Sequence, residues 1–235
     1  AAAVTGGAAA LVVDHVLPGL SDSVIQLVVD DVRAAMGWLS AAFHGNPSQR
    51  MTVVGITGTN GKTTTAHLLA SILGTAGVRT EVLGTLQGRY TTPESPDLQA
   101  TLEHLLDTGT RAVTMEVSSH ALAFGRVIGT TFAAGVFTNL GRDHLDFHRT
   151  QEAYFAAKAR LFEPDLVAVG VVNADDPFGQ RLLDIGHVPM TAFGRDDAQD
   201  VDVGIGNHEF TWSGRRIRVN LGGSMNVMNS LAAAT

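Results

Sequence analysis

The sequence predicts an α/β protein with a mainly parallel sheet that helices cover on both faces. From residue 51 onward, short runs rich in Val, Ala and Ile alternate with longer helical patterns. Near-continuous apolar runs of this kind are typical of parallel strands that are buried on both faces. A shorter stretch with strand and helix patterns of its own precedes residue 47. We therefore expect one large α/β domain preceded by the remnant of a smaller N-terminal α/β domain.

The N-terminal stretch is expected to hold two short apolar strands and one helix. The strands are predicted at Ala10–Val13 and within residues 24–30, and the helix over Val32–Phe43. Gly, Asn and Pro follow one another at residues 45–47, a combination that breaks regular structure. This cluster predicts a linker and a domain boundary after residue 47.

The large domain is expected to alternate strands with helices and to end in a hairpin and a helix. Strands are predicted at residues 52–57, 78–85, 112–117, 132–139 and 166–176, and helices at 62–77, 95–108, 150–162 and 226–235. Ser95 is the expected N-cap of the second of these helices, with Pro96 at its first position. Residues 208–221 alternate in polarity around Ser213 and Gly214, which predicts the hairpin.

Composition excludes several classes of function. The chain has 235 residues, of which 45% are hydrophobic and 17% charged, as in a globular protein. A net charge of −7 without a basic stretch argues against a nucleic-acid partner. The absence of cysteine excludes disulfides and thiol chemistry. No apolar run approaches the length of a membrane span, so we expect a cytoplasmic protein without membrane insertion.

A glycine-rich loop between the strand at 52–57 and the next helix is the first candidate site. It reads GTNGKTT, but the full phosphate-loop pattern would also need glycine where Ile56 stands. Gly58 and Gly61 still let backbone N–H groups close around phosphate oxygens at a helix N-terminus. Lys62 can reach the β- and γ-phosphates, and the Thr63 hydroxyl can ligate Mg²⁺. The loop predicts nucleotide binding; the alternative is a tight turn with an exposed lysine.

Polar residues follow another expected strand at the same edge of the sheet. Glu116 ends the strand at 112–117, and ligands of open parallel sheets bind beyond the carboxyl ends of the strands. Its carboxylate would therefore face the phosphates and could hold Mg²⁺. Ser118 and Ser119 follow as possible donors to a substrate. The alternative is that Glu116 is simply solvated.

A cluster of acidic and histidine residues follows the strand at 132–139. Asp143, His144, Asp146 and His148 lie within six residues, and such a group could bind a metal. A zinc hydrolase site is one alternative, and a polar capped turn is another for Asp146 and His148. Without cysteine and with a phosphate loop in the same sheet, phosphate-bound Mg²⁺ is favoured. Lys158, in the helix at 150–162, is expected on residue type alone to be a solvated surface lysine.

Taken together, these motifs resemble the Mur ligases, the ATP-dependent amino-acid ligases of peptidoglycan synthesis. The motifs are GTNGKTTT, YTTPE, MEVSSHAL, FTNLGRDHLDFH, AAKARLF, NADD and NVMNSLAA, and the resemblance covers about residues 53–234. It is closest to the MurE type, which adds the third residue, diaminopimelate or lysine, to UDP-MurNAc-L-Ala-D-Glu. The resemblance implies a phosphate-loop Mur ligase central domain at residues 48–235. Residues 1–47 would be the C-terminal part of the UDP-binding N-terminal domain.

The resemblance also implies roles for individual residues. Lys62 and Thr63 would hold ATP and a first Mg²⁺, Glu116 would bridge the metals, and His144 would ligate a second Mg²⁺. Lys158 matches the family lysine that CO₂ converts to a carbamate, and it would be a further metal ligand. The full set of implied ATP-binding residues is Gly58, Thr59, Asn60, Gly61, Lys62, Thr63, Thr64, Asn226 and Asn229.

For the muramyl-peptide substrate, the resemblance implies contacts with Thr91, Thr92, Ser118 and Arg126. Phe124 stands where the family often has a glutamine, which puts one substrate contact in doubt. The amino-acid-binding C-terminal domain is expected to be absent, so the chain alone is expected to bind nucleotide weakly, to catalyse no ligation and to be a monomer. The implied reaction proceeds through an acyl phosphate.

Three other functions remain open at this point. Folylpolyglutamate synthase shares the ATP loop and the carbamylated lysine, although the YTTPE and SSHAL segments favour the muramyl substrate. A non-catalytic ATP-binding module is the second alternative, against which the presence of Lys62, Glu116, His144 and Lys158 weighs. A metal hydrolase that needs no ATP is the third.

Overall fold

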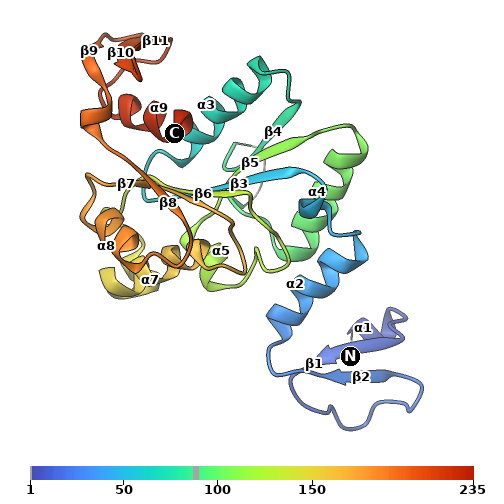
Figure 1. Ribbon diagram of the computed structural model, residues 1–235. Coiled ribbons are helices and arrows are strands. Elements are labelled where there is room, and N and C mark those ends of the chain that lie inside the picture. Colours follow the sequence, from blue (N-terminus) through green and yellow to red (C-terminus); the bar gives the residue numbers. More distant parts are fainter. Residues whose placement is uncertain (1, 87–89) are drawn as a thin grey trace.

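The computed structural model describes residues 2–86 and 90–235, and its centre is a six-stranded parallel sheet (Figure 1). The strand order is β4-β5-β3-β6-β7-β8, and every neighbouring pair is parallel. The predicted fold class is confirmed. In chain order the strands are β3 (Thr52–Thr57), β4 (Thr80–Leu83), β5 (Ala112–Glu116), β6 (Ala134–Phe137), β7 (Gly170–Asn173) and β8 (Met190–Phe193).

Helices cover both faces of this sheet (Figure 1). One face packs against α3 (Lys62–Thr75) and α9 (Met225–Ala234). The other face packs against four helices: α4 (Ser95–Asp107), α5 (Ser119–Ala123), α7 (Gln151–Ala159) and α8 (Pro177–Ile185).

The central strand β3 shows why the apolar runs are continuous. Val53 lies in the core beneath α4 and α7, whereas Val54 and Ile56 lie in the core beneath α3 and α9. Successive side chains of a strand point to opposite faces, and here both faces are buried. Ile56, which replaces the first glycine of the phosphate-loop pattern, is fully buried inside β3. The functional loop therefore begins after this strand and needs no glycine at position 56.

The parallel strands bring the loops that follow them to one edge of the sheet. Ile56 pairs with Glu116 of β5, and Thr57 pairs with Phe137 of β6. The segments after β3, β5 and β6 therefore begin side by side, as the position of Glu116 predicted.

A three-stranded antiparallel sheet of order β11-β10-β9 lies near α9. The predicted hairpin is confirmed, with Ser213 at φ 49° and Gly214 at φ 74° between β10 (His208–Trp212) and β11 (Arg215–Val219). The third strand, β9 (Gln199–Val203), was not predicted. Its residues, QDVDV, do alternate between Asp and Val over positions 200–203, but all five are exposed, and the strand forms by pairing with β10.

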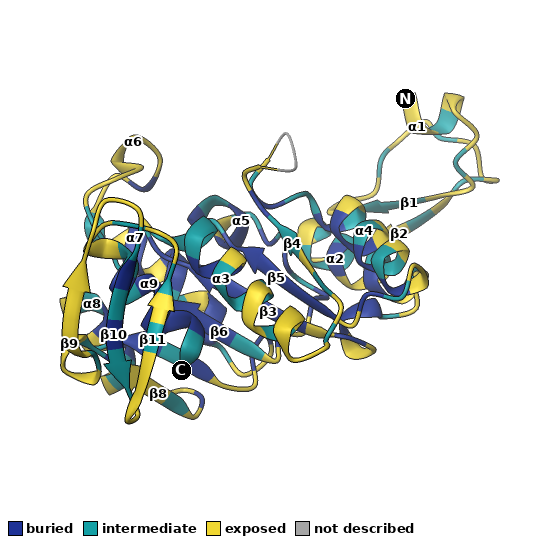
Figure 2. Cartoon of the chain, turned by 90° about the horizontal axis from the view of Figure 1, so that it is seen from above, coloured by how far each residue is buried: buried dark blue, intermediate teal, exposed yellow. Residues whose placement is uncertain are grey.

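The N-terminal elements form a small layer beside the main body (Figures 1 and 2). β1 (Ala10–Val13) pairs in parallel with β2 (Ile25–Val28), and α1 (Ala2–Thr5) precedes them. Helix α2 (Val32–Phe43), which was predicted with these bounds, packs against α4 of the main body. Among residues 2–86 and 90–235, none of the helices has the length and apolar character that crossing a membrane requires.

The start of α4 differs from the prediction. Glu94, not Ser95, is the cap residue, and Ser95 is the first helical residue. The Ser95 side chain is fully buried, so its hydroxyl does not fold back to cap the helix. The half-buried carboxylate of Glu94 makes its contacts outside the helix, with Arg33 and Arg126.

Candidate active site

The loop between β3 and α3 has the properties of an anion-binding turn. Helix α3 begins at Lys62, and its cap residue Gly61 has φ 88°, in the left-handed region that favours glycine. Gly61 has no side chain to bond the first N–H groups of α3, so these donors have no side-chain cap. Such donors, together with the positive end of the helix dipole, attract phosphate groups.

The loop lies directly against helix α9. A Cβ atom placed on Gly61 would overlap the side-chain oxygen of Asn229. Asn229 donates in turn to Asn226 Oδ1 at 2.9 Å, and Asn226 donates to the carbonyl of Gly222 at 2.6 Å. Residues more than 160 positions apart in the sequence, which were predicted to bind one nucleotide, therefore lie together.

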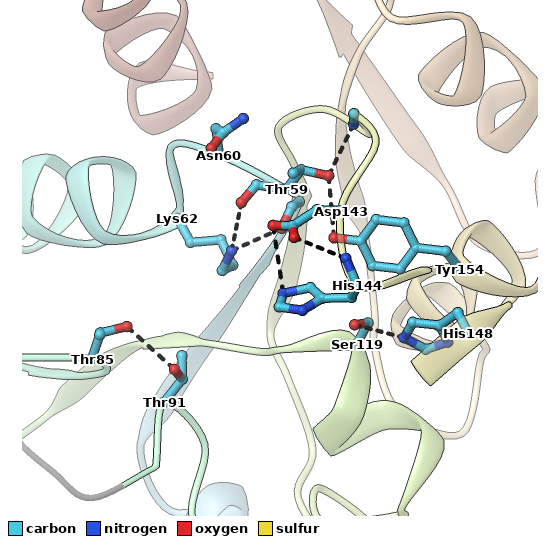
Figure 3. A network of polar contacts seen from close by, with 12 residues as sticks. Thr59, Asn60, Lys62, Thr85, Thr91, Ser119, Asp143, His144, His148 and Tyr154 are labelled. Carbon is cyan, nitrogen blue, oxygen red and sulfur yellow. Dashed lines mark hydrogen bonds and ion pairs between the residues drawn. The ribbon is translucent and has the colours of Figure 1, made fainter. Parts of the chain in front are cut away.

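Two lysines converge on one carbonyl of the loop. Lys62 Nζ donates to the carbonyls of Gly58 and Thr59, both at 2.9 Å (Figure 3). Lys158 Nζ donates to the carbonyl of Gly58 at 2.8 Å. Burial lowers the pKa of Lys62, although Glu116 and Asp143 act in the opposite direction.

Lys158 is 1% exposed, so the prediction of a solvated surface lysine was wrong. Helix α7 turns Tyr154 and Lys158 to the same buried side, four residues apart, and the Lys158 ammonium lies 4.6 Å from the centre of the Tyr154 ring. Burial, and then the nearby charge of Lys62, hold the pKa of Lys158 well below its ordinary value. The amine is thereby shifted toward its neutral, nucleophilic form.

Glu116 is buried at the end of β5 and is held by one residue. Thr85 donates its backbone N–H to Glu116 Oε1 at 2.9 Å and its hydroxyl to Oε2 at 3.2 Å. A carboxylate oxygen accepts more than one bond, so both oxygens keep lone pairs for a further partner. The alternative that Glu116 is merely solvated was wrong.

Asp143 and His144 lie on the loop after β6 and face the phosphate loop (Figure 3). His144 has a left-handed backbone at φ 51°, and its Nε2 lies 3.6 Å from Asp143 Oδ2. Within the described ranges, no three His, Cys, Asp or Glu side chains gather closely enough to hold a metal by themselves. The described side chains thus give no support to the zinc hydrolase alternative.

His148 has a structural contact instead of a free ring. It ends the short helix α6 (Leu145–His148), is buried, and its Nε2 lies 2.9 Å from Ser119 Oγ (Figure 3). Burial lowers the pKa of His148, with smaller effects in the same direction from His120 and Lys158. The ring therefore joins α6, which follows His144, to helix α5.

The residues predicted to contact a substrate lie in one region beside Glu116. Thr92 is fully buried; its hydroxyl donates to the carbonyl of Glu116 at 2.9 Å and accepts from the N–H of Ser118 at 3.1 Å. Thr91 lies on the more open side, with its hydroxyl 3.3 Å from that of Thr85 (Figure 3). Arg126 donates to the carbonyl of Thr92 at 3.3 Å.

Several residues of the site were not singled out from the sequence. The Tyr154 hydroxyl lies 3.2 Å from Thr59 Oγ1. Asn139 accepts from the N–H of Asn60 and donates to its carbonyl, both at 3.0 Å, and Thr138 Oγ1 donates to the same carbonyl at 2.6 Å. Thr138 and Asn139 directly follow β6, just as the residues after Glu116 follow β5. Their position at the carboxyl end of a parallel strand is the signal that could have identified them.

A cavity of about 190 Å³ opens beside Asn229, between α9 and the ends of β6 and β7. Asn139, Asp175, Arg195 and Met228 are among its lining residues. Two larger hollows, of about 480 and 550 Å³, flank the other end of α9, and none of their lining residues belongs to the phosphate loop. The small cavity is lined instead by Asn139 and Asn229, whose side chains contact Asn60 and Gly61 of the phosphate loop.

Comparison with known proteins identifies one family for this arrangement. Residues 56–235 match the family described as the Mur ligase middle domain. A Geobacter metallireducens protein named UDP-N-acetylmuramoyl-L-alanyl-D-glutamate--2,6-diaminopimelate ligase is 48% identical over 205 residues, which are 80% of this chain and 40% of the relative. Its namesake from Streptomyces avermitilis is 45% identical over 228 residues, which are 88% of this chain and 45% of the relative.

A solved structure of a protein with the same name has a similar fold. It superimposes with a TM-score of 0.83 at 30% identity and covers 99% of this chain and 52% of the solved one. The chain thus spans about half, or less, of the length of the proteins that it matches. Since the family match takes in most of the sequence, the chain belongs to the Mur ligase family, and residues 56–235 form its middle domain.

Proposed function

We propose that the chain is the ATP-binding part of a ligase that adds diaminopimelate to UDP-MurNAc-L-Ala-D-Glu. The names of the relatives support the substrate, and the family membership supports the reaction. The observation that carries the proposal is the meeting of Lys62, Lys158 and Glu116 around the N-terminus of α3. A cation, a buried amine and a buried carboxylate at a helix N-terminus suit phosphoryl transfer better than they suit a structural turn.

ATP fits this loop on structural grounds. The first turn of α3 has no side-chain cap, and the left-handed Gly61 leaves its donors open to phosphate oxygens. We assign the phosphates to the segment from Gly58 to Thr64, with Lys62 neutralising the transferred phosphoryl group. The adenosine would extend toward Asn226 and Asn229 and the cavity beside them.

Mg²⁺ fits the same edge of the sheet. Glu116 keeps free lone pairs on both carboxylate oxygens, and the Thr63 hydroxyl stands in the first turn of α3. We assign Thr63, Glu116, His144 and the carbamate of Lys158 as its protein ligands. Because Mg²⁺ takes oxygen ligands and often binds substrate phosphates, a site with few protein carboxylates suits it. Bound there, Mg²⁺ would neutralise the charge of the phosphates.

The environment of Lys158 favours carbamate formation. The neutral amine nitrogen attacks the carbon of CO₂, and loss of one proton leaves an anionic carbamate. This reaction requires the free amine, which the depressed pKa of Lys158 favours. The carbamate is an anion beside the Lys62 ammonium, so attraction would replace the repulsion that opposes protonation of the Lys158 amine.

The reaction activates a carboxylate in two steps. An oxygen of the substrate's D-Glu carboxylate attacks the γ-phosphorus of ATP, ADP leaves, and an acyl phosphate forms. The amine of the incoming amino acid then attacks the acyl carbon, loses a proton, and phosphate leaves. Lys62 contributes positive charge near the transferred group, and positioning supplies most of the remaining acceleration.

The substrate side of the site and the domain organisation complete the proposal. We assign Thr91, Ser118 and Arg126 to the muramyl peptide. The buried Thr92 hydroxyl accepts a hydrogen bond from the backbone N–H of Ser118 and so holds Ser118 in place. Residues 1–47 would be the end of a UDP-binding domain and residues 48–235 the ATP-binding domain. The relatives are about twice as long as this chain, and the complete reaction would also need the parts of the protein that correspond to the rest of their length.

The test is phosphate release from ATP by the full-length gene product. The assay contains UDP-MurNAc-L-Ala-D-Glu and diaminopimelate, lysine or no amino acid. We expect release that requires the nucleotide-peptide and diaminopimelate together, and that Lys62→Ala abolishes. Release that ignores the muramyl substrate, or normal ADP formation by Lys62→Ala, would overturn the proposal.

A further inference from the structure

An arginine from the N-terminal segment reaches the region assigned to the muramyl peptide. Arg33 lies in the first turn of α2, and its Nη1 is 3.4 Å from Glu94 Oε2 and 3.4 Å from the carbonyl of Phe124. Its guanidinium carbon also lies 5.2 Å from the centre of the Phe124 ring, within the range of a cation–π contact. Arg33 thus holds Glu94 and Phe124 at the same time.

Arg126 contacts the same two residues, Glu94 and Phe124. Its Nε forms an ion pair with Glu94 Oε1 at 2.8 Å, and its guanidinium carbon lies 5.8 Å from the centre of the Phe124 ring. Each oxygen of Glu94 therefore faces a different arginine. The pair lacks hydrogen-bond geometry: among the described residues, the buried Nε–H of Arg126 has no hydrogen-bond acceptor.

Helix α2 is fixed firmly enough to place Arg33. A Cβ atom on Gly37 would lie only 2.6 Å from the carbonyl oxygen of Ile128, so α2 packs directly against the backbone of the main body. At the other end of the helix, His44 Nδ1 lies 2.7 Å from Glu103 Oε2 of α4. Arg33 is therefore carried on an anchored element.

We propose that Arg33 is a positioning residue that keeps Arg126 available to an anionic group of the substrate. The proposal rests on the proposed function, in which Arg126 contacts the muramyl peptide. Arginine and carboxylate pair most strongly through two parallel bonds. Because Arg33 occupies one oxygen of Glu94, Arg126 meets only the other and makes a one-pronged contact that a substrate carboxylate can replace. Phe124, whose ring contacts both guanidinium groups, helps to fix their positions.

Loss of Arg33 would free the second oxygen of Glu94 to pair with Arg126. The substrate would then compete with a two-pronged internal ion pair. The Arg33–Glu94 contact is partly exposed, with side chains 53% and 33% accessible, so its effect is limited by solvent. We expect Arg33→Ala to raise the KM for UDP-MurNAc-L-Ala-D-Glu about fivefold, which matches a contact of this kind.

The experiment measures steady-state phosphate release by the full-length gene product. In Arg33→Ala, kcat and the KM for ATP should stay within twofold of the parent, since neither depends on Arg126. Arg33→Lys keeps a cation beside Glu94 and should restore most of the lost affinity. Arg111→Ala, an exposed arginine at the amino end of β5, is the matched control and should change nothing.

The double variant separates the possible failures. If Arg33 acts through Arg126, adding Arg33→Ala to Arg126→Ala should change the KM for the nucleotide-peptide by less than twofold. An Arg126→Ala variant with normal KM would refute the proposed substrate role of Arg126 itself. If Arg126→Ala raises that KM but Arg33→Ala does not, or if Arg33→Ala lowers all kinetic constants alike, the positioning role is wrong.

Discussion

The contact between the phosphate loop and α9 can be tested by adding a single methyl group. Gly61 has φ 88°, and a Cβ atom there would overlap the side-chain oxygen of Asn229. Gly77, at the other end of α3, has a similar φ of 83°, but a Cβ atom there would have no neighbour within 4 Å. Gly61→Ala and Gly77→Ala therefore share the backbone strain and differ only in the collision.

The expected magnitudes follow from these two contributions. An alanine in the left-handed region costs about 1 kcal/mol or slightly more relative to glycine. Displacing Asn229 also breaks its hydrogen bond to Asn226, which costs about 1 kcal/mol more. For a chain of this size, 1 kcal/mol lowers the Tm by about 2–4 °C. We expect Gly77→Ala to lower the Tm by about 2–4 °C and Gly61→Ala by about 4–8 °C.

The assay is scanning calorimetry of both variants, with and without ATP and Mg²⁺. A bound ligand raises the Tm by mass action. Gly77→Ala should keep the increase that the parent shows, whereas Gly61→Ala should lose most of it, because the loop and Asn229 move apart. Equal losses of Tm, or an unchanged response of Gly61→Ala to nucleotide, would refute the reasoning.

Two further predictions concern buried groups of the site. Lys158 has a depressed pKa, so the unfolded chain binds more protons than the folded chain between that pKa and 10.5, and stability rises with pH in that window. In CO₂-free buffer, the stability of Lys158→Met relative to the parent should therefore be greatest near pH 7 and fall toward pH 10. Urea unfolding titrations at several pH values would measure this difference in stability. A difference that stays constant with pH would show that Lys158 does not titrate in this way. Thr85→Val removes the hydroxyl bond to Glu116 and should destabilise the chain by about 1 kcal/mol in the same titration, and an unchanged midpoint would mean that water replaces the hydroxyl.

The sequence was sufficient where the local pattern and the fold agree. The apolar run of β3 and the glycines beyond it predicted the strand, the loop and the start of α3, because each is determined by residues a few positions apart. The position of Glu116 near the phosphate loop was also predictable, because the carboxyl ends of parallel strands lie at the same edge of the sheet.

The rest depended on contacts between distant segments. Lys158 has an ordinary surface residue type, and only the packing of α7 against the sheet buries it. The expected cap at Ser95 failed because the side chain enters the core and Glu94 takes the cap position. Strand β9 has only a short Asp–Val alternation whose valines stay exposed, and it exists through its pairing with β10.

The strand order has a consequence for how the chain folds. β3 comes first in the sequence among the six strands, yet it lies between β5 and β6, which arrive much later in the chain. The bond from Lys158 to Gly58 closes a loop of 100 residues. Pairings across such separations form slowly, because a long chain must be ordered before they contribute. The phosphate loop, although short and early in the sequence, therefore reaches its final shape late in folding, and nucleotide binding during refolding would report the completed sheet.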